Sequence, residues 1–349
     1  MRAGLLVGLN EFKVRELEKP VPGPNEVLIK VKTAGICDSD IHKMLNKWEY
    51  PLPMVMGHEF AGVVEEVGFS VEKVQPGNRV AAAPLIPCGE CPYCQAGRYQ
   101  FCEDAAMIGS QRYGGFAEYV TVPERNVLKI GWMSFEEAAM IEPSAEAAYG
   151  VMSLDVKLGD TVAVFGLGTT GALSVGWLQL AGAKKIIVVD IDQNRLNVAF
   201  MHGATDTINP MQESLEERIF ELTNGLGVDV VLRCAGSVIT DEQCMQVTKK
   251  GGRIGFQGSA YSDLMIEQKT VENIFRQEYS IQGFWNSFSP PFPSKAWQHT
   301  IDFMNQGRIE VKSLISHRFS LNDLQAAFDL TVQQKESYNK VMIYPGSNP

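Results

Sequence analysis

The chain has 349 residues, 45% hydrophobic and 21% charged, a composition typical of a globular protein long enough for two domains. Its 31 Lys and Arg against 41 Asp and Glu leave a net charge of −10, which argues against nucleic-acid binding through a basic surface. No apolar run approaches the roughly 20 residues of a membrane span, and MRAGLLVGLNEF lacks the layout of a signal peptide. We therefore expect a cytoplasmic protein that contacts neither nucleic acid nor membrane.

The order of elements predicts one domain inserted into another. From residue 26 to about residue 122 the sequence is rich in β-branched residues and broken by Gly and Pro, which indicates an all-β, partly barrel-like domain. After Ser134 strands alternate with helices, which indicates a parallel sheet. We predict a β domain in two parts, 1–148 and 283–349, around a nucleotide-binding domain at 149–282.

Two short stretches of the first part carry residues that bind metals. GICDSDIH contains Cys37, and GHEFAGVVEEVG, twenty residues later, contains His58 and Glu59. A thiolate, an imidazole and a carboxylate form a mixed ligand set that leaves room for water or substrate. Taken singly, each residue also has an ordinary interpretation: a core cysteine, a hydrogen-bonded histidine and an ion-paired glutamate.

Four of the seven cysteines lie between residues 88 and 102, in PCGECPYCQAGRYQFC. Four thiolates at this spacing can enclose Zn²⁺ in a closed tetrahedral site, which has no place for a substrate and staples a loop. An iron–sulfur cluster and unligated thiols are the alternatives. The predicted ligands of this structural lobe are Cys88, Cys91, Cys94 and Cys102.

The run SFEEAAMIEPSAEAAYG places a glutamate, Glu142, inside an apolar helical segment. Ser134 and Glu137 form a capping-box pattern that predicts a helix start. Pro143 disfavours helical geometry at the residue before it and suits the first turn of a new helix. We therefore expect the helix to break at Glu142 and to free its side chain.

The stretch VAVFGLGTTGALSVGWLQLAGAKKIIVVD has the pattern of a dinucleotide site. Gly166, Gly168 and Gly171 follow a strand and open a helix, and Asp190 ends the next strand, where it favours NAD over NADP. The alternative is a glycine-rich turn without a ligand, and Arg195 could equally be a solvated helix charge. The residues expected to bind the coenzyme are Gly166, Gly168, Thr169, Thr170, Gly171, Asp190, Arg195 and Gly258.

The pattern GHE-x2-G-x5-G, formed by 57–59, Gly62 and Gly68, resembles the signature of zinc-containing medium-chain alcohol and polyol dehydrogenases. Cys37 and the four-cysteine lobe fall where that family has them, and the similarity runs from residue 26 to the closing strand. The resemblance implies an α/β plus β fold: a GroES-like β-barrel catalytic domain with an inserted Rossmann domain that binds NAD. It also implies an active site in the cleft between the domains and a homodimer or homotetramer.

The resemblance assigns roles to individual residues. It implies a catalytic zinc held by Cys37, His58 and Glu59, with Glu142 reaching the metal directly or through water. The polyol branch carries Glu-Pro at this position, where other alcohol dehydrogenases carry a cysteine. Ser39 matches the hydroxyl beside the substrate oxygen, and His42 the far end of the proton relay. Glu146 departs from the pattern, since polyol enzymes commonly have an apolar residue there.

The loops PLIPCGECPYCQAGRYQFC and GFWNSFSPPFPSKAW resemble those of polyol-phosphate dehydrogenases such as galactitol-1-phosphate 5-dehydrogenase. The function implied is oxidation of a secondary alcohol of a polyol phosphate to the ketose phosphate. Arg112, Asn286 and Lys295 are candidate phosphate or substrate ligands, although each could equally be a surface or loop-packing residue. The alternatives are a dehydrogenase of unphosphorylated polyols or diols, and a non-catalytic binding protein built on this scaffold.

Overall fold

The computed structural model describes residues 1–45, 50–236, 238–258, 263 and 266–346, and the chain forms two compact units. Unit 1 comprises Met1–Glu142, Phe288–Gly307 and Val311–Pro349, and unit 2 comprises Pro143–Ser287 and Arg308–Glu310. The sequence placed these divisions after residues 148 and 282. Among the described residues, no helix is both long and apolar enough to cross a membrane.

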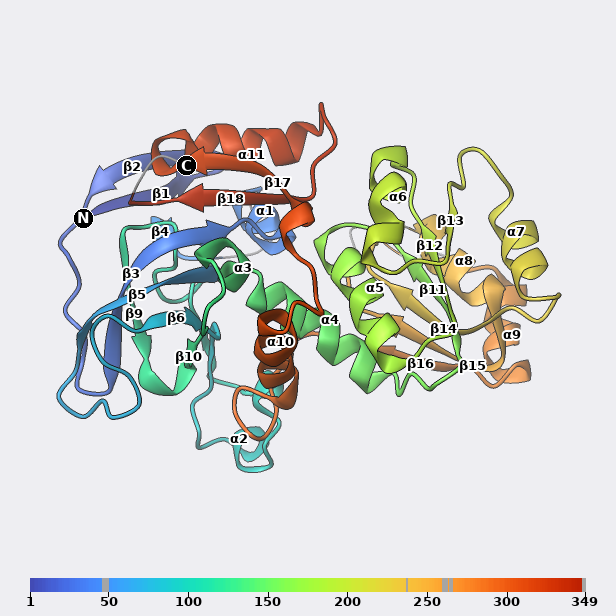
Figure 1. The fold of residues 1–349 in the computed structure, drawn as a ribbon, viewed down its shortest axis with the longest axis horizontal. Helices are drawn as coiled ribbons and strands as arrows, with labels where there is room; N and C mark the ends of the chain where they lie inside the picture. The colour runs from blue at the N-terminus through green and yellow to red at the C-terminus, as the bar shows by residue number, and fades with distance from the viewer. Residues whose placement is uncertain (46–49, 237, 259–262, 264–265, 347–349) are drawn as a thin grey trace. The chain divides into compact units, whose positions relative to one another are not determined.

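Unit 1 is a β structure built from both ends of the chain. Its central sheet has the order β10-β6-β5-β3-β18-β17, with β9 also paired to β3, so that a strand from the C-terminal end lies beside β3 (Figure 1). Smaller sheets, β2-β1-β4 and β7-β8, complete it. The strands are β1 (Arg2–Gly8), β2 (Glu11–Glu16), β3 (Glu26–Gly35), β4 (Met54–Val55), β5 (Glu59–Val67), β6 (Arg79–Ala82), β7 (Leu85–Ile86), β8 (Ala106–Met107), β9 (Tyr119–Pro123), β10 (Val127–Lys129), β17 (Ile315–Ser320) and β18 (Lys340–Tyr344).

Short helices connect these strands, and α11 packs on the core of unit 1 through Leu324, Ala327 and Phe328. The helices are α1 (Asp38–Met44), α2 (Pro92–Gln95), α3 (Phe135–Ala139), α10 (Lys295–Asn305) and α11 (Leu324–Gln333), with 3-10 turns at Tyr99–Phe101, Glu124–Asn126, Lys312–Leu314 and Leu321–Asp323.

The glycines of the GHE-x2-G-x5-G pattern are required by close packing of the backbone. A Cβ added at Gly62 would lie 2.2 Å from the carbonyl oxygen of Lys30 on the neighbouring strand β3. A Cβ at Gly68 would lie 2.0 Å from the carbonyl oxygen of Gly23. Both distances are far inside van der Waals contact, so these two positions of the pattern are needed for the close packing of the β3–β5 region.

The helical segment after Ser134 differs from the expectation in one respect. The predicted capping box is present, with the Glu137 N–H 3.3 Å from Ser134 Oγ and the Ser134 N–H 2.8 Å from Glu137 Oε2. However, the break falls at Met140, and α4 (Ile141–Ser153) already includes Glu142 and Pro143 in its first turn. The expected break at Glu142 is therefore wrong: the N–H groups of a first turn have no intrahelical partner, so proline costs no hydrogen bond there.

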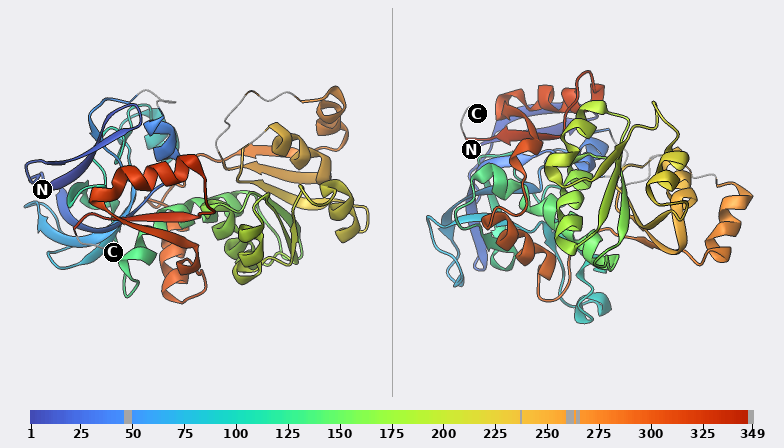
Figure 2. Two further views of the ribbon diagram at one scale, coloured as in Figure 1. Left: turned by 90° about the horizontal axis from the view of Figure 1, so that it is seen from above. Right: turned by 45° about the vertical axis from the view of Figure 1, so that its right-hand side comes forward.

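Unit 2 is a doubly wound parallel sheet with the order β13-β12-β11-β14-β15-β16, which confirms the predicted nucleotide-binding fold. Helices α5 and α6 lie on one face, and α7, α8 and α9 on the other (Figures 1 and 2). The elements are β11 (Thr161–Phe165), α5 (Thr169–Ala181), β12 (Lys185–Val189), α6 (Gln193–Ala199), a 3-10 turn (Phe200–His202), β13 (Asp206–Ile208), α7 (Leu215–Leu222), β14 (Val228–Arg233), α8 (Val238–Val247), β15 (Thr248–Phe256), α9 (Gln268–Arg276) and β16 (Ser280–Gly283).

The packing of Gly62 makes a first prediction. Gly62→Ala should destabilise the protein by about 1–3 kcal/mol, because the new methyl group forces β5 away from β3. Gly283→Ala is the matched control, since no atom of the residues that the structure describes lies within 4 Å of its added Cβ. The melting temperature of each variant, measured by differential scanning calorimetry, checks this. Equal melting temperatures for the two variants would contradict the steric explanation.

Candidate functional site

The three candidate metal ligands of unit 1 come together where two strands meet. β3 and β5 are antiparallel, and the last residue of β3, Gly35, pairs with the first residue of β5, Glu59. Cys37 follows the one strand and His58 precedes the other, so that the ligand atoms of Cys37, His58 and Glu59 lie within 4.8 Å of one another. A Cβ at Gly35 would lie 2.2 Å from Glu59 Oε2, so a glycine is needed to leave room for this carboxylate.

A lysine that the sequence analysis did not select holds the carboxylate of Glu59. Lys340 begins β18 and is 2% exposed. Its Nζ donates to both carboxylate oxygens of Glu59, at 2.8 and 2.6 Å, and to the carbonyl oxygen of Ile36 at 3.0 Å. The only signal in the sequence is that a lysine precedes the apolar residues of the strand KVMIY. This pattern is also typical of a strand that begins at the surface, so it does not indicate a buried lysine.

Asp40, on α1, lies beside the Nδ1 edge of the His58 ring. Its buried carboxylate places Oδ1 3.5 Å from Nδ1 of His58 and 3.5 Å from Nζ of Lys43. Its Oδ2 accepts the backbone N–H of Cys37 at 3.2 Å, and Lys43 also donates to the carbonyl oxygen of Gly109 at 3.2 Å. Because Nδ1 of His58 faces this carboxylate, Nε2 is the ring nitrogen left for a metal.

The charges buried around Cys37 fit a divalent cation. Three carboxylates and two ammonium groups give −3 + 2 = −1, and a Cys37 thiolate would make the total −2. Burial, followed by the charge of Glu59, raises the pKa of the Cys37 thiol to about 12, so the thiolate forms only beside a further cation. Zn²⁺ suits both this charge and a sulfur, nitrogen and oxygen donor set. The charged groups are Asp40, Glu59, Glu142, Lys43 and Lys340.

Glu142 adds its charge to this cluster. It is 8% exposed. Burial lowers the pKa of His58 and of Lys340, but nearby carboxylates, led by Asp40 and by Glu59 respectively and including Glu142, outweigh it and raise both values. Glu142 does not belong to the group whose ligand atoms all lie within 4.8 Å of one another. Its ligation of zinc, directly or through water, stays a prediction.

The two predicted relay residues lie on α1, directly after Cys37. Ser39 is partly exposed and His42, in the last turn of the helix, is 8% exposed. Their spacing of three residues places them on the same side of the helix. The structure is therefore compatible with a relay from Ser39 to His42, which stays a prediction.

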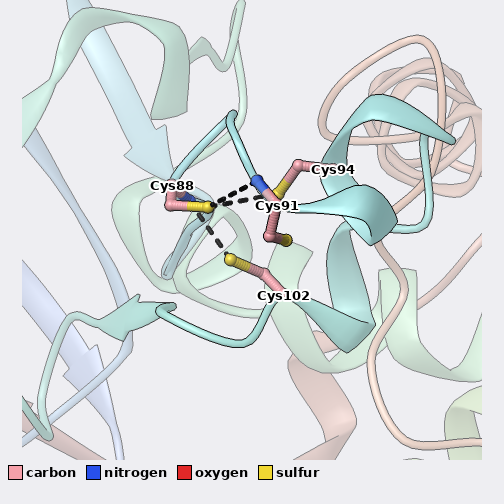
Figure 3. Close-up of side chains that lie close together, drawn as sticks. All are labelled: Cys88, Cys91, Cys94 and Cys102. Atoms are coloured by element: carbon pink, nitrogen blue, oxygen red, sulfur yellow. Dashed lines mark hydrogen bonds between the residues drawn. The ribbon is translucent and has the colours of Figure 1, made fainter.

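The four cysteines of the lobe converge as predicted (Figure 3). The sulfur atoms all lie within 4.8 Å of one another, and those of Cys88 and Cys94 are 3.9 Å apart. Zn–S bonds of about 2.3 Å in a tetrahedron require sulfur atoms about 3.8 Å apart. Backbone hydrogen bonds lower the pKa of the Cys91 thiol to about 6, whereas burial raises the pKa of Cys94 to about 12 and also raises that of Cys102, so these two thiols would form thiolates only with a bound cation. The residues therefore fit a closed zinc site.

This lobe packs against the Pro-rich segment that follows residue 287. A Cβ added at Gly97 would lie 2.4 Å from Cγ of Pro290, and the rings of Tyr99 and Phe292 meet edge to face with centroids 5.5 Å apart. The guanidinium of Arg125 lies 5.7 Å from the ring centroid of Phe292. A metal held by the four cysteines would therefore stabilise the surface against which this segment packs.

In unit 2 the predicted glycines form a tight turn at the carboxyl end of β11. Gly166 has φ of +91°, which favours glycine, and a Cβ at Gly171 would lie 1.9 Å from the Gly166 carbonyl oxygen. Gly168 is the N-cap of α5, directly before Thr169 and Thr170. Among the described residues, nothing lies within 4 Å of a Cβ added at Gly168, which leaves space in front of this helix N-terminus. The turn therefore suits a pyrophosphate.

Asp190 follows β12 and connects this turn to the next helix. Its Oδ2 accepts the N–H of Leu167 at 2.6 Å, and its Oδ1 accepts the N–H of Asp192 at 2.8 Å. Arg195 lies beside it, with Nη1 3.9 Å from Asp190 Oδ2. The carboxylate is thus held at the edge of the sheet where a ribose of the coenzyme is expected.

A buried arginine supports the predicted coenzyme residue Gly258. Arg233 ends β14, is 2% exposed, and pairs with Asp241 through Nε at 2.6 Å and Nη2 at 3.1 Å. Its Nη1 donates to the carbonyl oxygen of Gly258. A Cβ at Gly258 would lie 2.5 Å from the carbonyl oxygen of Cys234, so the segment is closely confined. The sequence analysis passed over Arg233 because an arginine at a strand end is usually exposed.

The three candidate substrate ligands belong to different parts of the structure, Arg112 and Lys295 to unit 1 and Asn286 to unit 2. Arg112 pairs with Glu26, Nη2 to Oε1 at 2.5 Å, at the start of β3, nine residues or roughly 30 Å of strand from Gly35. Lys295 is exposed at the first turn of α10 in unit 1, whereas Asn286 is buried in unit 2. The pairing with Glu26 supplies Arg112 with a structural role, so its phosphate role has no support from this geometry.

Comparisons with known proteins identify the family. Residues 23–131 match the alcohol dehydrogenase GroES-like domain, and residues 169–306 match the zinc-binding dehydrogenase domain. The chain is 32% identical to the sorbitol dehydrogenase of Bacillus subtilis strain 168, over 99% of this chain and 97% of that one. It is 30% identical to the galactitol 1-phosphate 5-dehydrogenase of Escherichia coli K12, over 95% and 97%. The chain therefore belongs to the zinc-binding alcohol dehydrogenases, as the signature predicted.

Solved structures agree with this assignment. The galactitol-1-phosphate dehydrogenase of Escherichia coli superposes with a TM-score of 0.93 at 28% identity, covering 99% of this chain and 100% of that one. An alcohol dehydrogenase from Escherichia coli CFT073, complexed with the cofactor NADH, gives a TM-score of 0.88 at 32% identity and covers 99% of both chains. These neighbours confirm the predicted GroES-like and Rossmann domains.

The ion pair of Lys340 yields a prediction on stability. Lys340→Met should destabilise the zinc-free protein by about 3–5 kcal/mol, because it leaves the Glu59 carboxylate buried without its partner. The melting temperature after removal of zinc with a chelator measures this loss. Zinc should restore part of it, since the metal replaces the missing positive charge.

Lys13→Met is the control for this prediction. Lys13 pairs with Glu11 at 2.6 Å, but both side chains are about half exposed, at 48% and 53%, so the change should cost less than about 1 kcal/mol. Equal losses in the two zinc-free variants would contradict the importance of the buried pair.

Proposed function

We propose that this chain is a zinc- and NAD-dependent dehydrogenase that oxidises a secondary alcohol of a polyol or polyol phosphate to a ketone, in a reversible reaction. The observation that carries the proposal is the buried cluster of Cys37, His58 and Glu59, which has the donors and the charge for one zinc ion. Family membership supplies the reaction class, and the glycine turn of unit 2 supports a nicotinamide coenzyme. Homo-oligomerisation stays a prediction.

The chemistry requires a Lewis acid and a hydride acceptor. When bound, zinc lowers the pKa of an alcohol ligand toward neutrality, and the nicotinamide coenzyme accepts a hydride. The residues suited to hold the metal are Cys37, Nε2 of His58 and Glu59, with Glu142 nearby. The residues suited to hold the coenzyme are the turn from Gly166 to Gly171 and the carboxylate of Asp190.

The remaining residues of unit 1 orient ligands and move a proton. Asp40 fixes the ring of His58, and Lys340 holds Glu59 by both oxygens, which limits how freely this carboxylate can turn to a metal. Ser39 accepts the proton of the substrate hydroxyl group and passes it on through hydroxyl groups to His42. An imidazole suits the end of this path because its ordinary pKa is near 6.5.

The preference for NAD follows from Asp190. A carboxylate at this position repels the 2′-phosphate of NADP and accepts hydrogen bonds from the ribose hydroxyls of NAD. Arg195, 3.9 Å from that carboxylate, offsets part of its charge. We therefore propose NAD as the coenzyme.

Two substrates remain in competition. The similarity in sequence and fold to galactitol-1-phosphate dehydrogenase favours a polyol phosphate. The ion pair of Arg112 with Glu26 favours an unphosphorylated polyol, because it occupies the first candidate phosphate ligand. The sorbitol dehydrogenase of Bacillus subtilis, to which the chain is similar, is named for an unphosphorylated polyol.

The test of the function compares substrates. We expect NAD-dependent oxidation, with kcat/KM highest on galactitol 1-phosphate, followed by pentitol phosphates and free sorbitol, and loss of activity on removal of zinc. A higher kcat/KM on sorbitol would select the unphosphorylated alternative. No oxidation of any secondary alcohol by the zinc-loaded protein would refute the proposal and favour a binding protein.

The relay has its own test. His42→Ala should slow alcohol oxidation by about 10²-fold below neutral pH, because the proton loses its acceptor, and less at alkaline pH, where hydroxide accepts it. The dissociation constant of NADH should stay the same. An unchanged pH dependence of kcat would remove His42 from the relay.

A further inference from the structure

Glu146, the acid that departs from the pattern of the polyol enzymes, has specific partners in unit 2. Its Oε1 accepts the backbone N–H of Ser287 at 2.9 Å and the hydroxyl of Ser287 at 2.7 Å. Its carbonyl oxygen accepts a hydrogen bond from the side-chain amide of Gln257. Ser287 is completely buried. One residue of α4 therefore holds two separate segments of the chain.

Both segments lie at the edge of the sheet where a dinucleotide binds. Gln257 follows the last residue of β15, and Ser287 lies four residues after the end of β16. All strands of this sheet are parallel, so their carboxyl ends share one edge with the glycine turn after β11 and with Asp190 after β12. A dinucleotide places one nucleoside over β11 and β12 and the other over the strands on the opposite side of the turn.

The order of the strands indicates which half of the coenzyme would lie near the partners of Glu146. β14, β15 and β16 continue the sheet from β11 on the side away from β12. The adenine ribose belongs with Asp190 at β12, so the nicotinamide half belongs with the ends of β14 to β16. The partners of Glu146 therefore lie in the region of the nicotinamide half.

The local packing shows that α4 is built to hold these segments. Gly150 lies one turn after Glu146 on the same face of α4, and a Cβ there would lie 2.6 Å from Oε1 of Gln257. Gln257 adjoins Gly258, whose carbonyl oxygen accepts a hydrogen bond from the buried Arg233. Charge-assisted hydrogen bonds to a buried serine are strong, and the serine donors lose their partner when the carboxylate is removed.

We propose that Glu146 is a positioning residue that holds the segments after β15 and β16 in place for the nicotinamide half of the coenzyme. The inference rests on the proposed function in one respect, which is that the chain binds a nicotinamide dinucleotide. It assigns no chemical step to Glu146. It predicts a defect in binding that is confined to one half of the coenzyme.

The experiment compares two ligands on the full-length, zinc-loaded protein. Glu146→Ala should raise the dissociation constant of NADH at least about tenfold, measured by calorimetry, because Ser287 loses its acceptor. ADP-ribose lacks the nicotinamide, so its dissociation constant should change less than about twofold. Glu146→Gln keeps an acceptor oxygen at the same place and should restore NADH binding to within about threefold of the original chain.

Two further variants separate positioning from general loss of structure. Ser287→Ala should weaken NADH binding in the same direction, and adding it to Glu146→Ala should cause little further loss, because both remove one interaction. Glu216→Ala, at an exposed acid in the first turn of α7, should leave both dissociation constants unchanged.

Several outcomes would overturn the inference. Equal losses for NADH and ADP-ribose, unchanged NADH binding in Glu146→Ala, or failure of Glu146→Gln to restore it would each do so. Failure of the proposed function alone gives a different result: the original chain would bind NADH with the expected pattern among variants but oxidise no polyol. A chain that binds no dinucleotide would overturn both the inference and the proposed function.

Discussion

The buried ion pair between Glu59 and Lys340 is the interaction on which the metal cluster of unit 1 depends. It joins residues 281 positions apart, from the first residue of β5 to the first residue of β18, across the strand β3 that lies between them. Burying a carboxylate that is 1% exposed would be costly without such a partner. By donating to both oxygens of Glu59, Lys340 orders this ligand within the fold.

The charge of Asp40, next to this cluster, is also balanced by neighbouring groups. Asp40 sits within 3.5 Å of both His58 and Lys43, and these neighbours outweigh burial and lower the pKa of its carboxyl group to about 2. The Asp40 carboxylate thus stays anionic because His58, Lys43 and the backbone N–H of Cys37 face it. Burial and the charge of Glu59 raise the pKa of the Cys37 thiol to about 12 although Lys340 acts in the opposite direction, so a metal cation would favour the thiolate.

The sequence revealed the donors of this site but not the residues that hold them. Cys37, His58 and Glu59 could be found because local patterns carry them, and the lobe because its four cysteines lie within fifteen positions. Lys340 and Arg233 could not, because each gains its meaning from a partner that only the fold brings near. The helix break was predicted at Glu142 but lies two residues earlier, at Met140. Proline costs no hydrogen bond anywhere in the first turn of a helix, so its position does not fix where the helix starts.

The pairing of buried and half-buried charges also limits which substrates the site can recognise. A phosphate group needs cations that are not already neutralised, and three cations of unit 1 are held in ion pairs. Lys340 faces Glu59, Lys43 faces Asp40, and Arg112 faces Glu26. With a net charge of −10, the chain has no general positive field to replace them. Recognition of a phosphorylated polyol would therefore have to use cations outside these pairs, whereas recognition of a free polyol needs only hydroxyl and carboxylate partners.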